Sequence, residues 1–80
     1  NYCVAKLGQP AEKYQGYLDY ACGKFDCWAI QASGPCFRPD TLVSHASYIL
    51  DLVYHVTGNC YPDIGVLTTF NRSYGDCQYP

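Results

Sequence analysis

The sequence has no methionine, few charged residues and no long apolar run. Charged residues make up 15 % of its 80 positions, and the net charge is −2. Proteins that bind nucleic acids or anionic membranes carry a basic stripe, so this mild acidic balance argues against both partners. Because no apolar run approaches the roughly 18 residues of a membrane helix, we expect no transmembrane segment. The chain starts at Asn1 with neither an initiator methionine nor an apolar leader, so we expect a mature, secreted product whose signal peptide has been removed.

Groupings of metal-binding residues are also missing. No two cysteines have the C-x-x-C spacing typical of zinc sites, and the only histidines are His45 and His55. We expect His45 to be a hydrogen-bonded core residue on the apolar face of a helix, and His55 to be solvated on its polar face. The sequence therefore predicts no metal site and no cofactor.

The seven acidic residues stand singly along the chain. None lies within i, i+3 or i+4 reach of another on a predicted helix, whereas a glycosidase needs two carboxyl groups that converge on one cleft. Asp40 is better explained as a helix cap and the others as solvated surface. We therefore do not expect the chain to be an enzyme.

Cysteine, by contrast, is abundant. Six cysteines at irregular intervals in so short a chain are typical of an extracellular disulfide framework. The core of a domain this small is thin, and three disulfides would add about 2–4 kcal/mol each. Cys22 and Cys27 are close enough for a local disulfide, but the spacing leaves the other pairings open.

Aromatic residues are abundant too, with nine tyrosines, three phenylalanines and Trp28. A tyrosine ring has an apolar body and a polar tip, so it suits wet contact surfaces as well as cores. This composition favours recognition over catalysis.

The periodicity predicts a first helix over residues 10–22. Pro10 suits its first turn, and Gly23 is expected to end it in the left-handed conformation. Gly16 inside the helix costs about 1 kcal/mol relative to alanine, so the helix must depend on packing. Its apolar face is formed by Tyr14, Tyr17, Leu18 and Ala21.

A second and stronger helix is predicted over residues 41–57, capped by Asp40 or Thr41 and ended by Gly58. The wide apolar arc means that most of this helix is buried. The arc contains Leu42, Ala46, Ile49, Leu50, Val53 and Val56, and the opposite, polar side contains Thr41, Ser44, Tyr48, Asp51 and His55.

The tail changes to a strand-like period. Residues 66–70 and 76–79 are predicted to pair as a hairpin around the loop 71–75. Asn71-Arg72-Ser73 in that loop is an N-x-S sequon, which makes Asn71 a candidate glycosylation site.

Tyr48 is the aromatic residue that is hardest to explain structurally. An exposed ring among hydrogen-bonding groups suits a sugar, which has CH-rich faces and hydroxyl groups. The alternative is that the hairpin, or the loop between Cys22 and Cys36, covers the ring.

Motifs along nearly the whole chain resemble the plant X8 domain, which is also classified as carbohydrate-binding module family 43. That family includes the C-terminal domain of plant β-1,3-glucanases, callose-binding proteins and olive-type pollen allergens. The matching residues are Cys3-Val4-Ala5-Lys6, Leu18-Asp19-Tyr20-Ala21-Cys22-Gly23, Asp26-Cys27, Ile30, Cys36-Phe37, Pro39, Thr41, His45-Ala46-Ser47-Tyr48, Ser73-Tyr74-Gly75, Cys77 and Tyr79-Pro80.

The resemblance implies one α+β domain over residues 1–80, with two helices packed at an angle, a small antiparallel sheet, and the disulfides Cys3–Cys60, Cys22–Cys27 and Cys36–Cys77. It also implies non-catalytic binding of β-1,3-glucan, of the callose or laminarin type, in the plant cell wall or apoplast. The carbohydrate-binding candidates at matching positions are Tyr20, Phe37, Tyr48, Tyr54, Tyr74 and Tyr79, with Asp19 and His45 as polar supports.

Several departures from the family pattern bear on binding. Tyr2 replaces the usual tryptophan before the first cysteine, and the loop before Cys60 is shorter. Asn71-Arg72-Ser73 replaces Asp-Pro-Ser, and the stretch 51–54 has one tyrosine fewer than usual. These changes motivate the alternative of a small secreted defence or bioactive protein with the same fold, acting on microbes, cells or another protein with little affinity for glucan.

Overall fold

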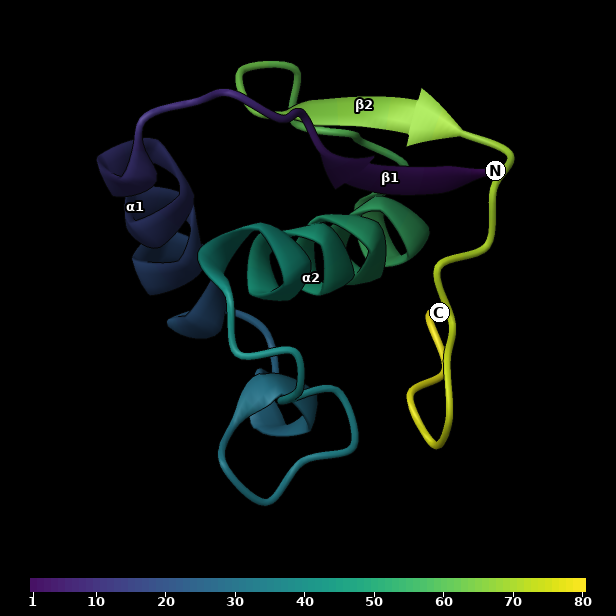
Figure 1. Ribbon diagram of the computed structural model, residues 1–80. Helices are drawn as coiled ribbons and strands as arrows, with labels where there is room; N and C mark the ends of the chain where they lie inside the picture. Colours follow the sequence, from purple (N-terminus) through teal and green to yellow (C-terminus); the bar gives the residue numbers. More distant parts are fainter.

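The computed structural model describes all residues 1–80. Figure 1 shows the sheet over one side of α2, with α1 crossing α2 at an angle and the irregular segment 23–40 below both helices. Two main helices, a two-stranded antiparallel sheet and three disulfides confirm the predicted α+β, disulfide-rich fold. The elements are β1 (Tyr2–Ala5), α1 (Ala11–Cys22), the short 3-10 helix η1 (Trp28–Ile30), α2 (Leu42–Thr57) and β2 (Gly65–Thr68).

Helix α1 has the predicted apolar face but not the predicted ending. Pro10 precedes its first residue, and the four apolar side chains of its inner face are all buried. Gly23 has a right-handed φ of −79°, so the left-handed ending predicted for it is wrong. The chain instead continues in a tight turn, where the N–H groups of Lys24 and Phe25 both donate to the Ala21 carbonyl. The Cys22–Cys27 disulfide closes this turn.

Helix α2 begins and ends as predicted. Thr41 caps it, with its Oγ1 accepting a hydrogen bond of 3.2 Å from the Ser44 N–H. At Gly58 the chain leaves the helix with φ +78°, a left-handed conformation that glycine adopts without steric cost. Val56, which the pattern placed in the buried arc, is 63 % exposed, because the apolar contacts of α2 fade in its last turn.

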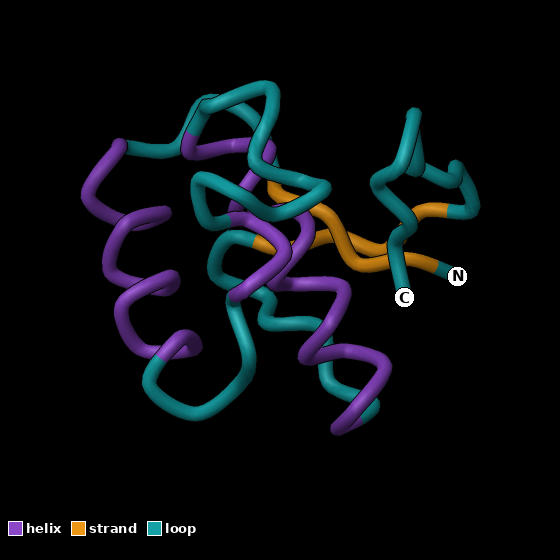
Figure 2. The backbone as a smooth tube through the Cα atoms, turned by 90° about the horizontal axis from the view of Figure 1, so that it is seen from below, coloured by secondary structure: helices purple, strands orange, loops and turns teal.

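The sheet differs from the prediction. β2 pairs antiparallel with β1, from Tyr2 opposite Thr68 to Ala5 opposite Gly65, so the hairpin predicted between residues 66–70 and 76–79 is wrong. Figure 2 shows the two strands side by side.

Disulfides explain this pairing. The Cys3–Cys60 disulfide holds the segment before β2 beside β1. The C-terminal segment forms only a tight turn, in which Tyr74 and Cys77 exchange backbone hydrogen bonds of 2.9 and 2.7 Å. Cys36–Cys77 ties that turn to the loop before α2. All three disulfides have the predicted partners.

The free edge of β1 is closed by side chains of α2. The Cys3 N–H donates to Asp51 Oδ1 at 2.8 Å, and the Ala5 N–H donates to Ser47 Oγ at 3.0 Å. Asp51 was predicted to be solvated, but it is fully buried. The prediction is wrong because this polar face of α2 lies against β1, where the strand offers N–H donors in place of water.

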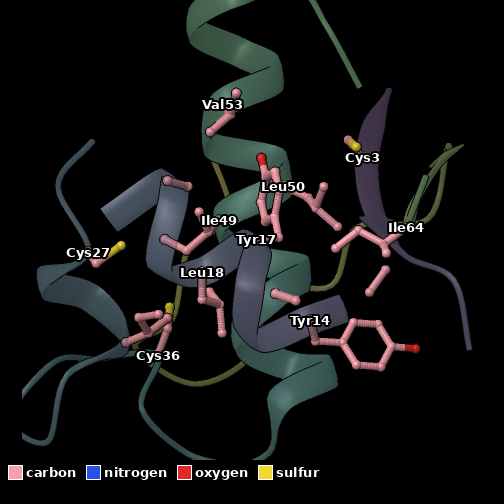
Figure 3. Close-up of a cluster of buried hydrophobic side chains, with 14 of the residues drawn as sticks. Cys3, Tyr14, Tyr17, Leu18, Cys27, Cys36, Ile49, Leu50, Val53 and Ile64 are labelled. Carbon is pink, nitrogen blue, oxygen red and sulfur yellow. The ribbon is translucent and has the colours of Figure 1, made fainter. Parts of the chain in front are cut away.

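The core lies between α1, α2 and the sheet (Figure 3). Ile49 and Leu50 of α2 are fully buried, and Tyr17 and Leu18 of α1 pack against the same cluster. Ile64 fills the end nearest the sheet. Several half-cystines complete the cluster, so the disulfides form part of the packing as well as cross-linking the chain.

Candidate functional site

Three hollows divide the predicted sugar-binding residues among separate parts of the surface. We name them the polar cleft, of about 610 Å³, the aromatic groove, of about 490 Å³, and the C-terminal hollow, of about 310 Å³. The polar cleft contains Asp19 and His45, the aromatic groove contains Tyr20, and the C-terminal hollow contains Tyr74 and Tyr79.

Tyr48 lies behind the C-terminal hollow and is half-buried. Its ring meets the Tyr79 ring edge-on, with the centroids 5.4 Å apart, so the C-terminal segment covers it. Burial raises the pKa of Tyr48, and the nearby carboxylates of Asp26 and Asp51 add to the rise. Of the two alternatives for Tyr48, an exposed ring or a covered one, the structure has the covered ring.

The rings of the C-terminal hollow are held by the protein itself. The Tyr74 hydroxyl donates to the Arg38 carbonyl, and the Tyr79 N–H donates to Ser73 Oγ at 2.8 Å. Burial raises the pKa of Tyr79 to about 12. Tyr74 is 39 % exposed, whereas Tyr79 is half-buried and packs against the core.

The polar cleft runs between α1, the start of α2 and the turn closed by Cys22–Cys27. His45 is buried, and its Nε2 donates to the Phe37 carbonyl at 2.7 Å, as expected of a hydrogen-bonded core histidine. Asp19 accepts a hydrogen bond of 2.9 Å from Gln15. No tyrosine, phenylalanine or tryptophan side chain lines this cleft.

The structure also brings carboxylates together that the sequence separates. Asp19 and Asp40 both line the polar cleft, and Glu12 and Asp63 both line the aromatic groove. All four are exposed. Sequence spacing could not show these pairs, because each joins α1 to a distant loop.

The aromatic groove lies between α1 and the segment that follows α2. The rings of Tyr17 and Tyr61 stack, with centroids 5.3 Å apart and an interplanar angle of 16°, and the Tyr20 centroid lies 6.3 Å from that of Tyr17. Tyr20 is 56 % exposed and Tyr61 is 42 % exposed, so two rings of this group face solvent. Lys13, Asn59 and the two acids supply hydrogen-bonding groups around them.

Tyr61 is anchored on both sides. Cys60 before it is bonded to Cys3, and the Tyr61 carbonyl accepts from the Gly65 N–H at 2.8 Å. Lys6 Nζ donates to the Pro62 carbonyl at 2.8 Å, and Lys13 Nζ forms an ion pair with Asp63 at 3.3 Å. These contacts fix the position of the Tyr61 ring relative to α1.

The hydroxyl group of Tyr17 is buried in this groove without a hydrogen-bond partner. Burial, with smaller contributions from Tyr20 and Tyr61, raises the pKa of Tyr17 to about 12. The helical pattern placed Tyr17 in the core, and Tyr61 was not among the binding candidates. The Cys3–Cys60 disulfide, not a local pattern, brings Tyr61 close to α1.

The remaining predicted residues lie apart from the aromatic groove. The centroid of the Phe37 ring lies 5.6 Å from the guanidinium carbon of Arg38 and 5.7 Å from the ring centroid of His45. Tyr54 is half-buried, and its ring meets that of His55 at 5.2 Å. His55 is exposed, as predicted. Two further exposed rings, Trp28 and Phe70, were not among the candidates.

Asn71 is exposed, and its Oδ1 accepts a hydrogen bond of 2.9 Å from the Ser73 N–H. Its glycosylation stays a prediction. No group of three or more His, Cys, Asp or Glu side chains is arranged to hold a metal ion. Neither main helix combines the length and apolar character needed to cross a bilayer.

Sequence comparison gives the class of this α+β domain. The family model of the X8 domain matches residues 1–62, and the chain therefore belongs to the X8 domain family. No solved structure matches the chain.

Curated relatives extend the match to nearly the full chain. A glucan endo-1,3-beta-glucosidase of Triticum aestivum is 39 % identical over 98 % of this chain, and a glucan endo-1,3-beta-D-glucosidase of Olea europaea is 40 % identical over 100 % of it. Glucan endo-1,3-beta-glucosidase 2 of Arabidopsis thaliana is 40 % identical over 98 %. The chain spans only 18 %, 19 % and 17 % of these three relatives, respectively.

Proposed function

We propose that this chain is a non-catalytic module that binds β-1,3-glucan through surface aromatic and polar residues. The observation that carries the proposal is that relatives named as glucan endo-1,3-beta-glucosidases contain a counterpart of the whole chain in less than a fifth of their length. In an enzyme that acts on β-1,3-glucan, such a small segment can hold the polymer while the rest of the enzyme cleaves it.

Exposed rings support sugar binding. A sugar ring stacks its CH-rich face on an aromatic ring that is open to solvent and hydrogen-bonds at its edges. Among the six aromatic candidates from the sequence, Tyr20 and Tyr74 are the exposed ones. Tyr48 and Tyr79 are half-buried against each other, so we assign them the role of supporting the surface rather than contacting the sugar.

The environment of the acids favours binding over hydrolysis. A glycosidase keeps one carboxyl group protonated by burying it in an apolar site. The four acids that line hollows in pairs are all exposed, and Asp63 is further held by Lys13. None of them has the apolar surroundings that a general acid requires.

The proposed module spans residues 1–80, because Cys36–Cys77 ties the segment beyond residue 62 to the rest of the chain. Three disulfides need an oxidising compartment, which supports secretion to the cell wall or apoplast, where the polysaccharide partner would be found.

Calorimetric titration of the chain with laminarihexaose tests the proposal. We expect saturable binding, and co-sedimentation with an insoluble β-1,3-glucan. Cellohexaose, which has the same sugar in β-1,4 linkage, serves as the control and should bind more weakly. Incubation with laminarin should release no reducing sugar.

The absence of both heat and chemical-shift change at millimolar sugar would reject glucan binding. A growth-inhibition or cytotoxicity assay on the same preparation would then test the alternative of a defence or bioactive protein. Release of reducing sugar would instead identify the chain as a hydrolase.

A further inference from the structure

We propose that the aromatic groove, formed by Tyr17, Tyr20 and Tyr61 with Gly16 on α1, is the site that binds the β-1,3-glucan. This inference rests on the proposed function and adds its location, because only Tyr20 of this group was a candidate from the sequence. The groove volume of about 490 Å³ lies within the range of roughly 300–1,000 Å³ common to small-ligand sites.

The arrangement of the rings suits a chain of sugar units. Tyr61 and Tyr20 are exposed, and both contact Tyr17, whose ring is buried and stacks on Tyr61. Two exposed rings supported by a third offer successive stacking surfaces. Glu12, Lys13 and Asn59 place charged and amide groups along the same groove, within reach of sugar hydroxyl groups.

Gly16 provides an independent argument. A glycine inside a helix lowers its stability relative to alanine, so it needs a reason. Here a Cβ at Gly16 would meet no atom within 4 Å, so packing does not require glycine. Its φ is not left-handed either. Gly16 lines the aromatic groove, one residue before Tyr17 and four before Tyr20, where a side chain would occupy the space that a ligand needs.

The unpartnered hydroxyl group of Tyr17 also points to a ligand. A buried donor without a partner is destabilising, and native proteins contain few of them. Tyr17 is 93 % buried, since 7 % of it is exposed, and its ring stacks on that of Tyr61, which lines the groove. A sugar hydroxyl that enters beside Tyr61 would give this group a partner.

The groove is also fixed before any ligand arrives. Lys6 and Lys13 hold the backbone and side chain of residues 62 and 63, and Cys3–Cys60 holds the residue before Tyr61. A preformed site loses less conformational entropy on binding than a mobile one.

The other two hollows suit glucan less well. The only ring that lines the polar cleft is the imidazole of His45, which is buried and so offers no face on which a sugar can stack. In the C-terminal hollow, the Tyr74 hydroxyl is bonded to the Arg38 carbonyl and the Tyr79 ring packs on Tyr48. The aromatic groove alone is lined by two exposed aromatic rings together with hydrogen-bonding neighbours.

Four variants, each titrated with laminarihexaose, test the location. Gly16→Leu fills the groove with a strong helix former, and Tyr20→Ala removes an exposed ring. We expect each to raise the dissociation constant roughly tenfold or more, in line with the loss of a central contact. The thermal midpoint of Gly16→Leu should not fall, because leucine favours the helix more than glycine does. A loss of affinity without a loss of stability cannot come from misfolding.

Gln15→Leu is the matched control, since it adds the same side chain to α1 on the side of the polar cleft. Phe70→Ala removes an exposed ring that lines none of the three hollows and was not a candidate from the sequence. Both should retain the affinity of the unaltered chain within roughly twofold.

The outcomes separate the site from the function. If the unaltered chain binds but only Gln15→Leu or Phe70→Ala loses affinity, or if Gly16→Leu and Tyr20→Ala bind normally, the groove is not the site although glucan binding stands. If the unaltered chain does not bind, both the proposed function and its location are rejected. Chemical-shift changes confined to residues that line the groove would support the location directly.

Discussion

The Asp51 carboxylate takes the place of a third strand along the free edge of β1. It accepts the Cys3 N–H through Oδ1, while its Oδ2 is buried without a partner. Burial raises the pKa of Asp51, although the Cys3 hydrogen bond and the nearby His55 oppose this rise. Asp51 thus satisfies one N–H group of the strand, beside the one that Ser47 satisfies, and places an incompletely paired acid in the core.

This acid predicts a pH dependence of stability. Because the pKa of Asp51 in the folded chain lies above its ordinary value, the folded chain holds the proton more tightly than the unfolded chain does. The contribution of Asp51 to the free energy of unfolding is therefore fully present below the unfolded pKa and is lost as pH rises through the folded pKa. Asp51→Asn keeps an acceptor for Cys3 but cannot ionise.

Urea unfolding of both proteins from about pH 3 to about pH 7 measures the effect. The free energy of unfolding of the unaltered chain, minus that of Asp51→Asn, should fall as pH rises. A difference that is constant or increases with pH would contradict the prediction. Asp51→Ala also leaves the Cys3 N–H unpaired, which should cost about 1–3 kcal/mol more than Asp51→Asn does.

For single residues, the sequence could predict the environment of a side chain when its neighbours lie close to it along the chain. His45 was expected to be a hydrogen-bonded core residue, and its bond to Phe37, eight residues away, confirms this. Asp51 and Tyr48 are different, since the groups that cover them come from opposite ends of the chain. A helical pattern shows which side chains share a face but not what packs on that face.

Helix α2 is the element whose boundaries follow most directly from local chemistry. Thr41 bonds to the Ser44 N–H, which otherwise has no acceptor within the first turn. We predict that Thr41→Ala lowers the free energy of unfolding by about 1 kcal/mol. Thr41→Ser, which retains the hydroxyl group, should lower it much less. Chemical denaturation under oxidising conditions measures both, and equal losses in the two variants would show that the cap is not the cause.

The strands were harder to predict than the helices. Residues 66–70 have the composition of a strand, and β2 covers most of them. The predicted partner of this strand was wrong. A hairpin with the next segment needs the shortest connection, whereas the actual partner, β1, lies about sixty positions earlier in the chain. What sets the true pairing is the covalent link from Cys60 to Cys3, and cysteine spacing alone did not determine that link.

The molecule as a whole depends on cross-links that span very different lengths of chain. Cys3–Cys60 spans 57 residues, and Cys22–Cys27 spans only 5. Because the loop-entropy contribution grows with loop length, we predict that replacing both cysteines of the long link by serine costs about 4 kcal/mol, and both of the short link about 2 kcal/mol. Thermal unfolding followed by circular dichroism tests this order, and a larger loss for the short link would contradict it.

The candidate site also depends on how the whole chain folds. The sequence could identify Tyr20 as an aromatic candidate, and the i, i+3 spacing places Tyr17 on the same helix. The sequence could not show that Tyr61 lies beside them. That position depends on the Cys3–Cys60 disulfide and on the contacts of Lys6 with Pro62 and of Lys13 with Asp63. The family resemblance supplied the ligand class, and only the folded chain shows which rings face solvent together.

The two long cross-links overlap along the chain, since one encloses residues 3–60 and the other residues 36–77. Every peptide bond from Cys3 to Cys77 therefore lies inside at least one covalent ring. A protease that cuts any one of these bonds produces two fragments that remain joined, so a nicked molecule keeps its mass until a reductant arrives. Such a chain can outlast single cuts in surroundings rich in digestive enzymes.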